Sequence, residues 1–491
     1  MDGTDWNQLL DHGLEKPAAY IVRLNGSTVE AINGQTGKRP FSGSSLSTVL
    51  SSVFNVLTAN RTWKERVVVK GNYTLDAAIE LVDYVILDLR EAKLTLGDGV
   101  NDHMSKAEGK SHFEVWGGRL DGNKSNNTSG GIIYLSSCSD FLIFGVHGEN
   151  ARSGIGCASC MDGSLKRCSL KDIGSPQSGG GIVFSGGERL TAEDCFTENT
   201  GAAGINVSGY SSPVYGVNII NCHVQGGGYC GINLFFNVYY GYVIGCEIEE
   251  VTFGWGIEFE NAMYCAAIGN IIHDCSPSIG IKLFGSSAFG NLAVGNVIRN
   301  VGRHGIAINS RWNTVMGNTI IDAGQSATGT YCGIAISGSD GGGDTGSDES
   351  IGNVIEGNVI RMLNGSLRYG IKEFASGSTD YNIIKNNIIL GTVTQAKISW
   401  IGQHTIVADN ANARTENYGE ATILSGQSSV TFNHEIEGVA ADGSNLLVVL
   451  GPKHSEVADA VWSADATQIT LTVPAAVSAD RKISWYARRI S

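Results

Sequence analysis

The chain has 491 residues and a formal net charge of −14, and 17 % of its residues are charged. Without a lysine or arginine cluster it lacks the basic face that binds nucleic acid or an anionic membrane. There is no basic segment followed by an apolar core at the N-terminus and no apolar run of about 20 residues. We therefore expect a soluble protein without a membrane span, which has no secretory signal or has lost it. The 66 glycines and 7 prolines indicate many tight turns, much buried β structure and few helices.

Residues 1–64 are predicted to form an N-terminal hairpin and a capping helix. The segment "YIVRLNGSTVEAINGQTGKRP" alternates and carries Asn-Gly turn signals. "SLSTVLSSVFNVLTAN" follows with helical spacing behind a serine N-cap. Such a helix would cover the open end of the stacked strands that follow, which must be capped to avoid edge pairing.

Residues 65–410 contain an internal repeat. A Gly-Ile unit recurs at intervals that are mostly 23 to 28 residues, with the isoleucines at Ile132, Ile155, Ile182, Ile205, Ile232, Ile257, Ile281, Ile306, Ile334 and Ile371. A second aligned position holds Cys168, Cys195, Cys222 and Cys246 and then Asn270, Asn296, Asn318, Asn358 and Asn387. Each unit has room for two or three short strands and no crossover helix. The repeat therefore predicts an all-β fold, a right-handed parallel β-helix.

The cysteines are expected to be small apolar side chains of the stack and not disulfide partners, because parallel stacking places like residues next to each other. The pair in "CASC", Cys157 and Cys160, has zinc-knuckle spacing but lacks a second ligand pair. We therefore expect no metal there. After residue 410 the Gly-Ile unit ends, and alternating segments predict a small antiparallel, sandwich-like β domain over residues 411–491.

Candidate site residues follow from the alternation of side chains along each strand. If the Gly-Ile isoleucine points inward, the next residue and the third residue after it point outward. The first outward column is then Val183, Asn206, Asn233, Glu258, Lys282, Ala307, Ala335 and Lys372. The second is Ser185, Ser208, Phe235, Glu260, Phe284, Asn309, Ser337 and Phe374. Amides, carboxylates and aromatic rings on one face are suited to binding a saccharide.

Glu258 and Glu260 are the candidate catalytic pair. Their spacing along a strand, about 6.5 to 7 Å, overlaps the carboxyl separation of inverting glycosidases. Lys282, about 4.8 Å away in the next coil, would keep one glutamate ionised. Glu260, between Phe235 and Phe284, is expected to be the acid and Glu258 the base, because apolar neighbours favour a protonated carboxyl group. The alternative is two charges on a solvated strand, with an ordinary Glu-Lys pair.

Other candidates lie at turns. Arg303 and His304, in an exposed turn before Ile306, could reach over the groove, and Arg368 and Tyr369 hold the equivalent place before Ile371. Glu373 falls on an inward position, so the register shifts or it is paired inside. The substrate-binding set is Asn206, Asn233, Phe235, Phe284, Arg303, His304 and Asn309. The insertion with Asp340, Asp344 and Asp348 could chelate Ca²⁺, although a solvated acidic loop is the simpler interpretation; we expect no other cofactor.

The repeats resemble the parallel β-helix superfamily of pectate lyases, polygalacturonases and phage tailspikes, over residues 65–410. "GGRLDGNKSNN", residues 117–127, is similar to a segment in the early turns of polygalacturonase-like and tailspike-like proteins. The C-terminal stretch resembles β modules that end some tail-fibre proteins, where trimers are common. Of the polygalacturonase motifs only "RHG" and "YGIKEF" are found, so the tailspike-like arrangement of outward acidic residues is the closer match.

Three functions remain open at this point. The first is a tailspike-like, polysaccharide-degrading glycoside hydrolase that uses Glu258 and Glu260. The second is a polysaccharide lyase, in which Lys282 or Lys372 removes the proton beside a uronate carboxyl group and Arg303 or Arg368 neutralises that group. The third is a non-catalytic glycan-binding adhesin or virion structural protein. The resemblance implies a homotrimer that is extracellular or on a virion surface, with a polysaccharide partner and no nucleic acid.

Overall fold

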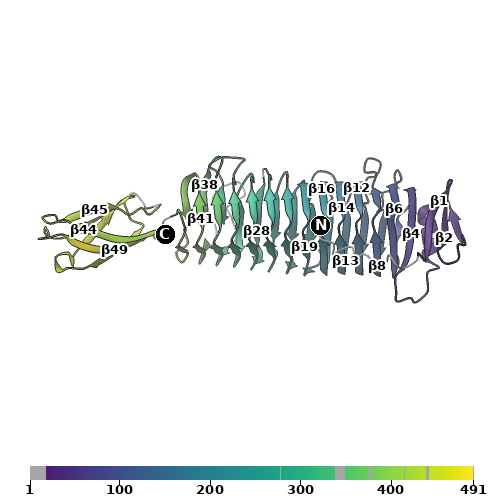
Figure 1. Cartoon of the computed structure of the whole chain (residues 1–491), viewed down its shortest axis with the longest axis horizontal. Coiled ribbons are helices and arrows are strands. Elements are labelled where there is room, and N and C mark those ends of the chain that lie inside the picture. The colour runs from purple at the N-terminus through teal and green to yellow at the C-terminus, as the bar shows by residue number, and fades with distance from the viewer. Residues whose placement is uncertain are drawn as a thin grey trace. The chain divides into compact units, whose positions relative to one another are not determined.

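The computed structural model describes residues 18–276, 278–337, 349–374, 379–413, 415–437, 439 and 442–489. The chain divides into two compact units, residues 1–278 (unit 1) and residues 279–491 (unit 2). Both are built almost entirely from β-strands, as the sequence predicts, and within each unit the strands of successive coils lie side by side (Figure 1). In the described part of the chain, no helix has the length and hydropathy that a membrane crossing requires.

Unit 1 begins with the predicted hairpin and helix. Strands β1 (Tyr20–Asn25) and β2 (Thr28–Asn33) are antiparallel, and β3 (Phe41–Gly43) adds to β2. Helix α2 (Leu46–Phe54) starts at Ser45, whose side chain accepts the Thr48 backbone N–H at 3.4 Å. Because β1 also pairs in parallel with β4 (Glu65–Leu75), the hairpin continues into the first coil.

The remaining strands of unit 1 form stacked parallel coils. They are β5 (Ile79–Glu80), β6 (Val85–Leu96), β7 (Ser105–Glu108), β8 (Ser111–Trp116), β9 (Arg119–Asp121), β10 (Ile133–Ser136), β11 (Ser139–Phe144), β12 (His147–Ala151), β13 (Ile155–Lys166), β14 (Ser169–Ile173), β15 (Ile182–Glu193), β16 (Phe196–Thr200), β17 (Ile205–Ser208), β18 (Val214–Tyr215), β19 (Asn218–Ile220), β20 (His223–Gly227), β21 (Cys230–Phe235), β22 (Val238–Tyr239), β23 (Tyr242–Ile244), β24 (Glu247–Glu249), β25 (Trp255–Glu260), β26 (Ala266–Ile268) and β27 (Ile271–His273). Within the unit, strands of one coil pair with equivalent strands of the next coil; β17, β21 and β25 are one such series.

Unit 2 continues the same pattern. Its coil strands are β28 (Ile279–Phe289), β29 (Leu292–Val294), β30 (Val297–Arg299), β31 (Ile306–Arg311), β32 (Thr314–Met316), β33 (Thr319–Ile321), β34 (Cys332–Ile336), β35 (Ser350–Ile351), β36 (Val354–Glu356), β37 (Val359–Arg361), β38 (Leu367–Glu373), β39 (Thr379–Asp380), β40 (Ile383–Lys385), β41 (Ile388–Leu390), β42 (Val393–Ser399) and β43 (Ile406–Ala408). The coil-to-coil pairing is parallel throughout this series.

The C-terminal part of unit 2 is antiparallel, as predicted. Strands β44 (Glu416–Ile423), β49 (Arg481–Arg489) and β46 (Leu446–Pro452) form one sheet. Strands β45 (Ser429–Asn433), β48 (Gln468–Thr472) and β47 (Val461–Ala464) form the other, and a short 3₁₀ helix, η2, spans Ser455–Val457. Side chains of both sheets, among them Ile423, Ile483 and Leu471, share one buried core.

The core of the coils confirms the repeat. All ten Gly-Ile isoleucines have no exposed surface. All eleven cysteines are buried thiols, so those at the aligned position are apolar side chains of the stack, as expected. In unit 2 the asparagines form a ladder: the Asn318 amide donates to Asn358 Oδ1, the Asn358 amide to Asn387 Oδ1 and the Asn387 amide to Asn410 Oδ1, each at 2.9 Å. This ladder satisfies polar groups that would otherwise be buried without partners.

Candidate functional site

The two predicted outward columns exist as register columns. In unit 1, Asn206 pairs with Asn233 and Asn233 with Glu258, while Phe235 pairs with Glu260. In unit 2, Lys282 pairs with Ala307, and Phe284 with Asn309. The alignment derived from the Gly-Ile unit is therefore confirmed within each unit.

The prediction that the first column is open to solvent is wrong at Asn233, Glu258 and Lys282. Glu258 has no exposed surface, Asn233 is 7 % exposed and Lys282 is 6 % exposed. Glu258 Oε2 accepts a hydrogen bond from Cys230 Sγ at 3.2 Å, and Lys282 Nζ lies 3.7 Å from the centre of the Phe284 ring. Neighbouring side chains on the outer face of the coils cover these three residues, whereas Asn206 and Lys372 of the same column are partly exposed.

The physical reason is a break in the alternation at the glycine of the repeat. A Cβ on Gly231 would lie 2.4 Å from Ile248 Cγ2, a core side chain. Gly231 therefore faces inward, as Ile232 does, and two inward residues in succession turn the preceding residue outward. This residue, Cys230 in unit 1, then lies beside the column that alternation predicted to be open.

The same break places His304 in unit 2. A Cβ on Gly305 would lie 2.5 Å from Ile320 Cγ2, so the residue before it, His304, lies on the outer side. His304 has no exposed surface; its Nδ1 accepts the Cys332 N–H at 2.9 Å, and its ring meets that of Tyr331 edge-on at 5.3 Å. The prediction of an exposed turn histidine is therefore wrong. Asn309 is also buried, at 7 % exposure, whereas Arg303 is partly exposed.

The second column of unit 1 is accessible. Phe235 and Glu260 are both partly exposed, and Phe235 lies within 6.5 Å of the Tyr210 ring, with an interplanar angle of 21°. Tyr210 is 72 % exposed. The predicted Asn206 is partly exposed one coil before Asn233.

Further aromatic rings continue from this column around the turn into the next strands. Tyr215 and Tyr239 are stacked at 5.0 Å, and Tyr240 and Tyr264 are stacked at 5.5 Å. Tyr215, Tyr240 and Tyr264 are 45 %, 50 % and 47 % exposed. We call the six rings the aromatic strip: Tyr210, Tyr215, Phe235, Tyr239, Tyr240 and Tyr264. Of this set only Phe235 was predicted from the sequence. The signal for the others is the pair Tyr239 and Tyr240, followed one coil later by Tyr264.

A group of cations around one ring forms a second candidate in unit 2. The Arg368 guanidinium lies 5.4 Å and Lys372 Nζ 5.2 Å from the centre of the Tyr369 ring. Lys372 Nζ also donates to Ser399 Oγ at 3.0 Å. Arg368, Tyr369 and Lys372 are each partly exposed, so these three residues, the Tyr369 cluster, can meet a ligand.

Glu373, next to this cluster, is paired inside. It has no exposed surface. Its Oε1 accepts from Asn382 Nδ2 at 2.9 Å and Thr405 Oγ1 at 2.8 Å, and its Oε2 accepts the Ile401 and Gly402 N–H groups at 3.0 Å each. Four neutral donors satisfy the carboxylate, so Glu373 ties the last coils together.

Metal binding rests on the sequence alone. Asp340, Asp344 and Asp348 lie outside the described residues. Among the residues that are described, no group of three or more His, Cys, Asp or Glu side chains is arranged to hold a metal ion. A Ca²⁺ site in the acidic insertion stays a prediction.

A family model and several solved structures are similar to this chain, and they support its fold. Residues 212–389 match the family model described as a right handed beta helix region. Among solved structures, the A-module of the mannuronan C-5 epimerase AlgE4 of Azotobacter vinelandii is 19 % identical, covers 70 % of this chain and 91 % of its own, and has a TM-score of 0.53. The tailspike protein gp49 of Pseudomonas phage LKA1 is 12 % identical, with coverages of 90 % and 91 % and a TM-score of 0.51.

No curated protein matched the sequence. At these identities the two solved structures show a shared fold, and the family model independently covers coils of both units. The chain is therefore a right-handed parallel β-helix protein, as its Gly-Ile repeat predicted.

Proposed function

We propose that the protein binds a polysaccharide along the aromatic strip and hydrolyses it beside Glu260. The observation that carries this proposal is the place of Glu260, which pairs in register with Phe235 at the edge of the strip. Exposed apolar surface gathered in one place marks a binding site more often than scattered single residues do. Rings on adjacent coils provide flat apolar surfaces for successive sugars, while Asn206 and Glu260 offer polar atoms to the hydroxyl groups.

In this proposal Glu260 protonates the oxygen of the leaving sugar. Glu258, two residues away on β25, is the candidate for the second carboxylate, which activates water; the spacing of about 6.5 to 7 Å along a strand fits the inverting geometry. A base must contact its water, and Glu258 has no exposed surface in the free protein. Catalytic hydrogen bonds often form only in the substrate complex, so this role requires that sugar binding exposes Glu258.

The fold is consistent with this class of substrate. The same fold is found in a mannuronan epimerase and in a phage tailspike, and fold alone does not determine which reaction occurs. We also propose that the protein is located on a virion or cell surface and that it assembles as a homotrimer.

The test is a panel of neutral and uronate-containing polysaccharides incubated with the full chain. New reducing ends without absorbance from unsaturated uronate are the expected result. Binding without new ends would overturn the hydrolase and leave a glycan-binding adhesin. If Glu260→Gln retains full activity on a substrate that the parent cleaves, Glu260 is not the catalytic acid.

The Tyr369 cluster supports a second candidate, a polysaccharide lyase. Elimination from a uronate needs a base, a cation that neutralises the carboxylate and an acid for the leaving oxygen. Lys372, Arg368 and Tyr369 are groups of these three kinds, and both cations lie within 5.4 Å of the centre of the Tyr369 ring. Ultraviolet absorbance that rises together with reducing ends, and that Lys372→Ala abolishes, would establish the lyase in place of the hydrolase.

A further inference from the structure

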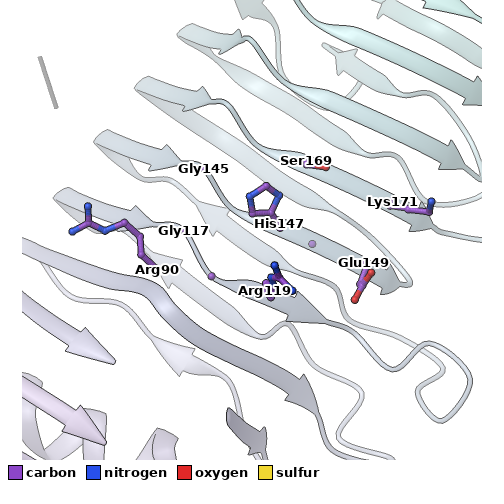
Figure 2. A pocket seen from close by; sticks show the side chains of 10 residues that line it. Arg90, Gly117, Arg119, Gly145, His147, Glu149, Ser169 and Lys171 are labelled. Atoms are coloured by element: carbon purple, nitrogen blue, oxygen red, sulfur yellow. The ribbon is translucent and has the colours of Figure 1, made fainter. Parts of the chain in front are cut away.

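Unit 1 contains an open pocket, with a volume of about 520 Å³, that lies between strands of neighbouring coils. It is lined by Arg90 of β6, Arg119 of β9, His147 and Glu149 of β12, and Ser169 and Lys171 of β14. Figure 2 shows these side chains coming from strands that lie side by side. None of them belongs to the aromatic strip, the Tyr369 cluster or the outward columns.

Glycines at the turns of two coils leave the pocket floor without side chains. Gly117 has φ +62°, and a Cβ there would lie 2.6 Å from Arg90 Cγ. Gly145, also at φ +62°, would direct a Cβ into open space. Both glycines line the pocket. A ligand can therefore approach the backbone closely at Gly145, whereas at Gly117 the Arg90 side chain lies where a Cβ would be.

The lining carries an excess of positive charge in a chain whose net charge is −14. Arg90, Arg119 and Lys171 are cations, and Glu149 is the one carboxylate that lines the pocket. Arg119 and His147 are exposed and are register partners on adjacent strands. Lys93, on the strand of the previous coil, is the other register partner of Arg119. Lys171 is paired with Glu198 at 2.8 Å, and Arg90 shares the Asp88 carboxylate with Arg66. The group of Arg66, Asp88 and Arg90 therefore keeps one net positive charge on the side of the pocket near Arg119.

Arg90 is held in place before any ligand binds. Its Nε donates to Asp88 Oδ1 at 2.9 Å and its Nη2 to Asp88 Oδ2 at 2.7 Å, and its guanidinium lies 5.1 Å from the centre of the Trp116 ring. A guanidinium with a fixed orientation presents its other N–H groups at little entropic cost. Such N–H groups match the geometry of a carboxylate.

We propose that this pocket binds a uronate residue of an acidic polysaccharide. Arg119 meets the carboxylate, Arg90 adds positive charge at the edge of the pocket, and His147 and Ser169 lie on the adjoining strands, where sugar hydroxyl groups would be placed. Glu149 accepts from a hydroxyl group and disfavours compact, highly charged anions. The proposal concerns binding only, and it holds whether or not the chain is cleaved beside Glu260.

The test is calorimetric titration of the full chain with trigalacturonate and with its methyl ester, which has the same ring structure but no charge. We expect the acid to bind, with an affinity that falls as salt rises, and the ester to bind at least about tenfold more weakly. Arg119→Ala should weaken binding of the acid at least about tenfold. Arg23→Ala, which removes the same charge from an exposed position on β1, should leave it within about twofold.

Several results would overturn the proposal. These are equal affinity for acid and ester, an Arg119→Ala variant that binds as the parent does, tighter binding of a sulfated than of a uronate trisaccharide, or complete competition by inorganic sulfate at the same concentration. Ser169→Trp, which fills the pocket without changing its charge, should also abolish binding. Circular dichroism of each variant separates a lost site from a lost fold. If Glu260→Gln loses cleavage but binds trigalacturonate with unchanged affinity, cleavage depends on Glu260 and binding in this pocket does not.

Discussion

The Cys230 thiol donates a hydrogen bond to Glu258 Oε2 at 3.2 Å, and both residues are completely buried. Strict alternation from Ile232 would place Cys230 inside the coil and Glu258 outside, so they should not meet. They meet because Gly231 and Ile232 both face the core. The glycine of the Gly-Ile unit is thus required by packing: it is the one residue small enough to lie against Ile248 at that corner.

Gly231→Ala should therefore destabilise the fold. A Cβ at this position would lie 2.4 Å from Ile248 Cγ2 and 2.5 Å from the Gly256 carbonyl oxygen, so backbone must move. Overpacking of this kind costs about 1 to 3 kcal/mol, and we expect a lower midpoint of urea unfolding. Gly156→Ala is the matched control, because its nearest contact is 3.3 Å away on the Tyr134 side chain. Equal midpoints for the two variants would contradict the inward glycine.

Glu260→Gln should reduce polysaccharide hydrolysis by about 100-fold or more, because general acid catalysis contributes at least that factor. Its KM should change little, since the amide retains the shape of the carboxyl group. The measurement is the rate of reducing-end formation at saturating substrate. Glu250→Gln, an exposed carboxylate in the same unit that accepts from Gln225, should retain the parent rate. Wild-type turnover in Glu260→Gln would exclude this residue as the acid.

Tyr210→Ala should raise KM about tenfold and leave kcat within about twofold. The ring is 72 % exposed, so its removal affects bound sugar and not the core, and a stacking platform of this kind contributes on the order of 1 kcal/mol. Tyr418→Ala, in the C-terminal sheets and 79 % exposed, is the control. A kcat loss without a change in KM would show that Tyr210 is not a binding surface.

The fold could be predicted from the sequence because the repeat is regular. Each coil places an isoleucine at the same point of the core, and the cysteine and asparagine positions repeat with it. Register within each unit followed directly from that period: the pairs Asn233–Glu258 and Phe235–Glu260 were obtained from spacing alone.

Exposure could not be obtained in the same way. Alternation is a rule for straight strands, and each coil bends at the glycine, so Glu258 and His304 were expected at the surface and are buried. The basic pocket was missed for a related reason. The pocket is lined by residues from four coils: Arg90, Arg119, His147 and Lys171. Whether these side chains come close together depends on the turns between the strands, and the period of the Gly-Ile unit does not predict those turns.

Asp88→Asn should lower stability at neutral pH more than in acid. Asp88 is 2 % exposed and is bonded by Arg66 and Arg90. Burial acts to raise the pKa of Asp88, but the hydrogen bonds from Arg90 and Arg66 bring it below its ordinary value of 3.8. Such a carboxylate stabilises the fold above the pKa of the unfolded chain, about 3.9, and this contribution is lost as the pH falls through the folded pKa.

The difference in unfolding midpoint between the parent and Asp88→Asn should therefore be full at pH 7 and shrink below about pH 4. Asp459→Asn, at an exposed position, is expected to match the parent at both pH values. A difference that grows on acidification would contradict the lowered pKa. Because Asp88 also orients Arg90, the same variant should weaken trigalacturonate binding at pH 7.

Asn358→Ala should be among the more destabilising substitutions in unit 2. Asn358 Oδ1 accepts the backbone N–H of Asn318 at 3.0 Å and its side-chain amide at 2.9 Å, and Asn358 Nδ2 donates to Asn387 and to the Val315 carbonyl oxygen. Alanine leaves these buried groups without partners, and each such group costs about 1 to 3 kcal/mol. We expect a loss of about 2 to 4 kcal/mol in the free energy of unfolding.

Lys385→Ala is the control: it removes a partly exposed ion pair with Glu356 and should cost less than about 1 kcal/mol. Since repeat proteins depend on contacts between neighbouring coils, hydrogen exchange should rise first at Asn318 and Asn387; uniform exchange along unit 2 would show that the ladder is not a local support.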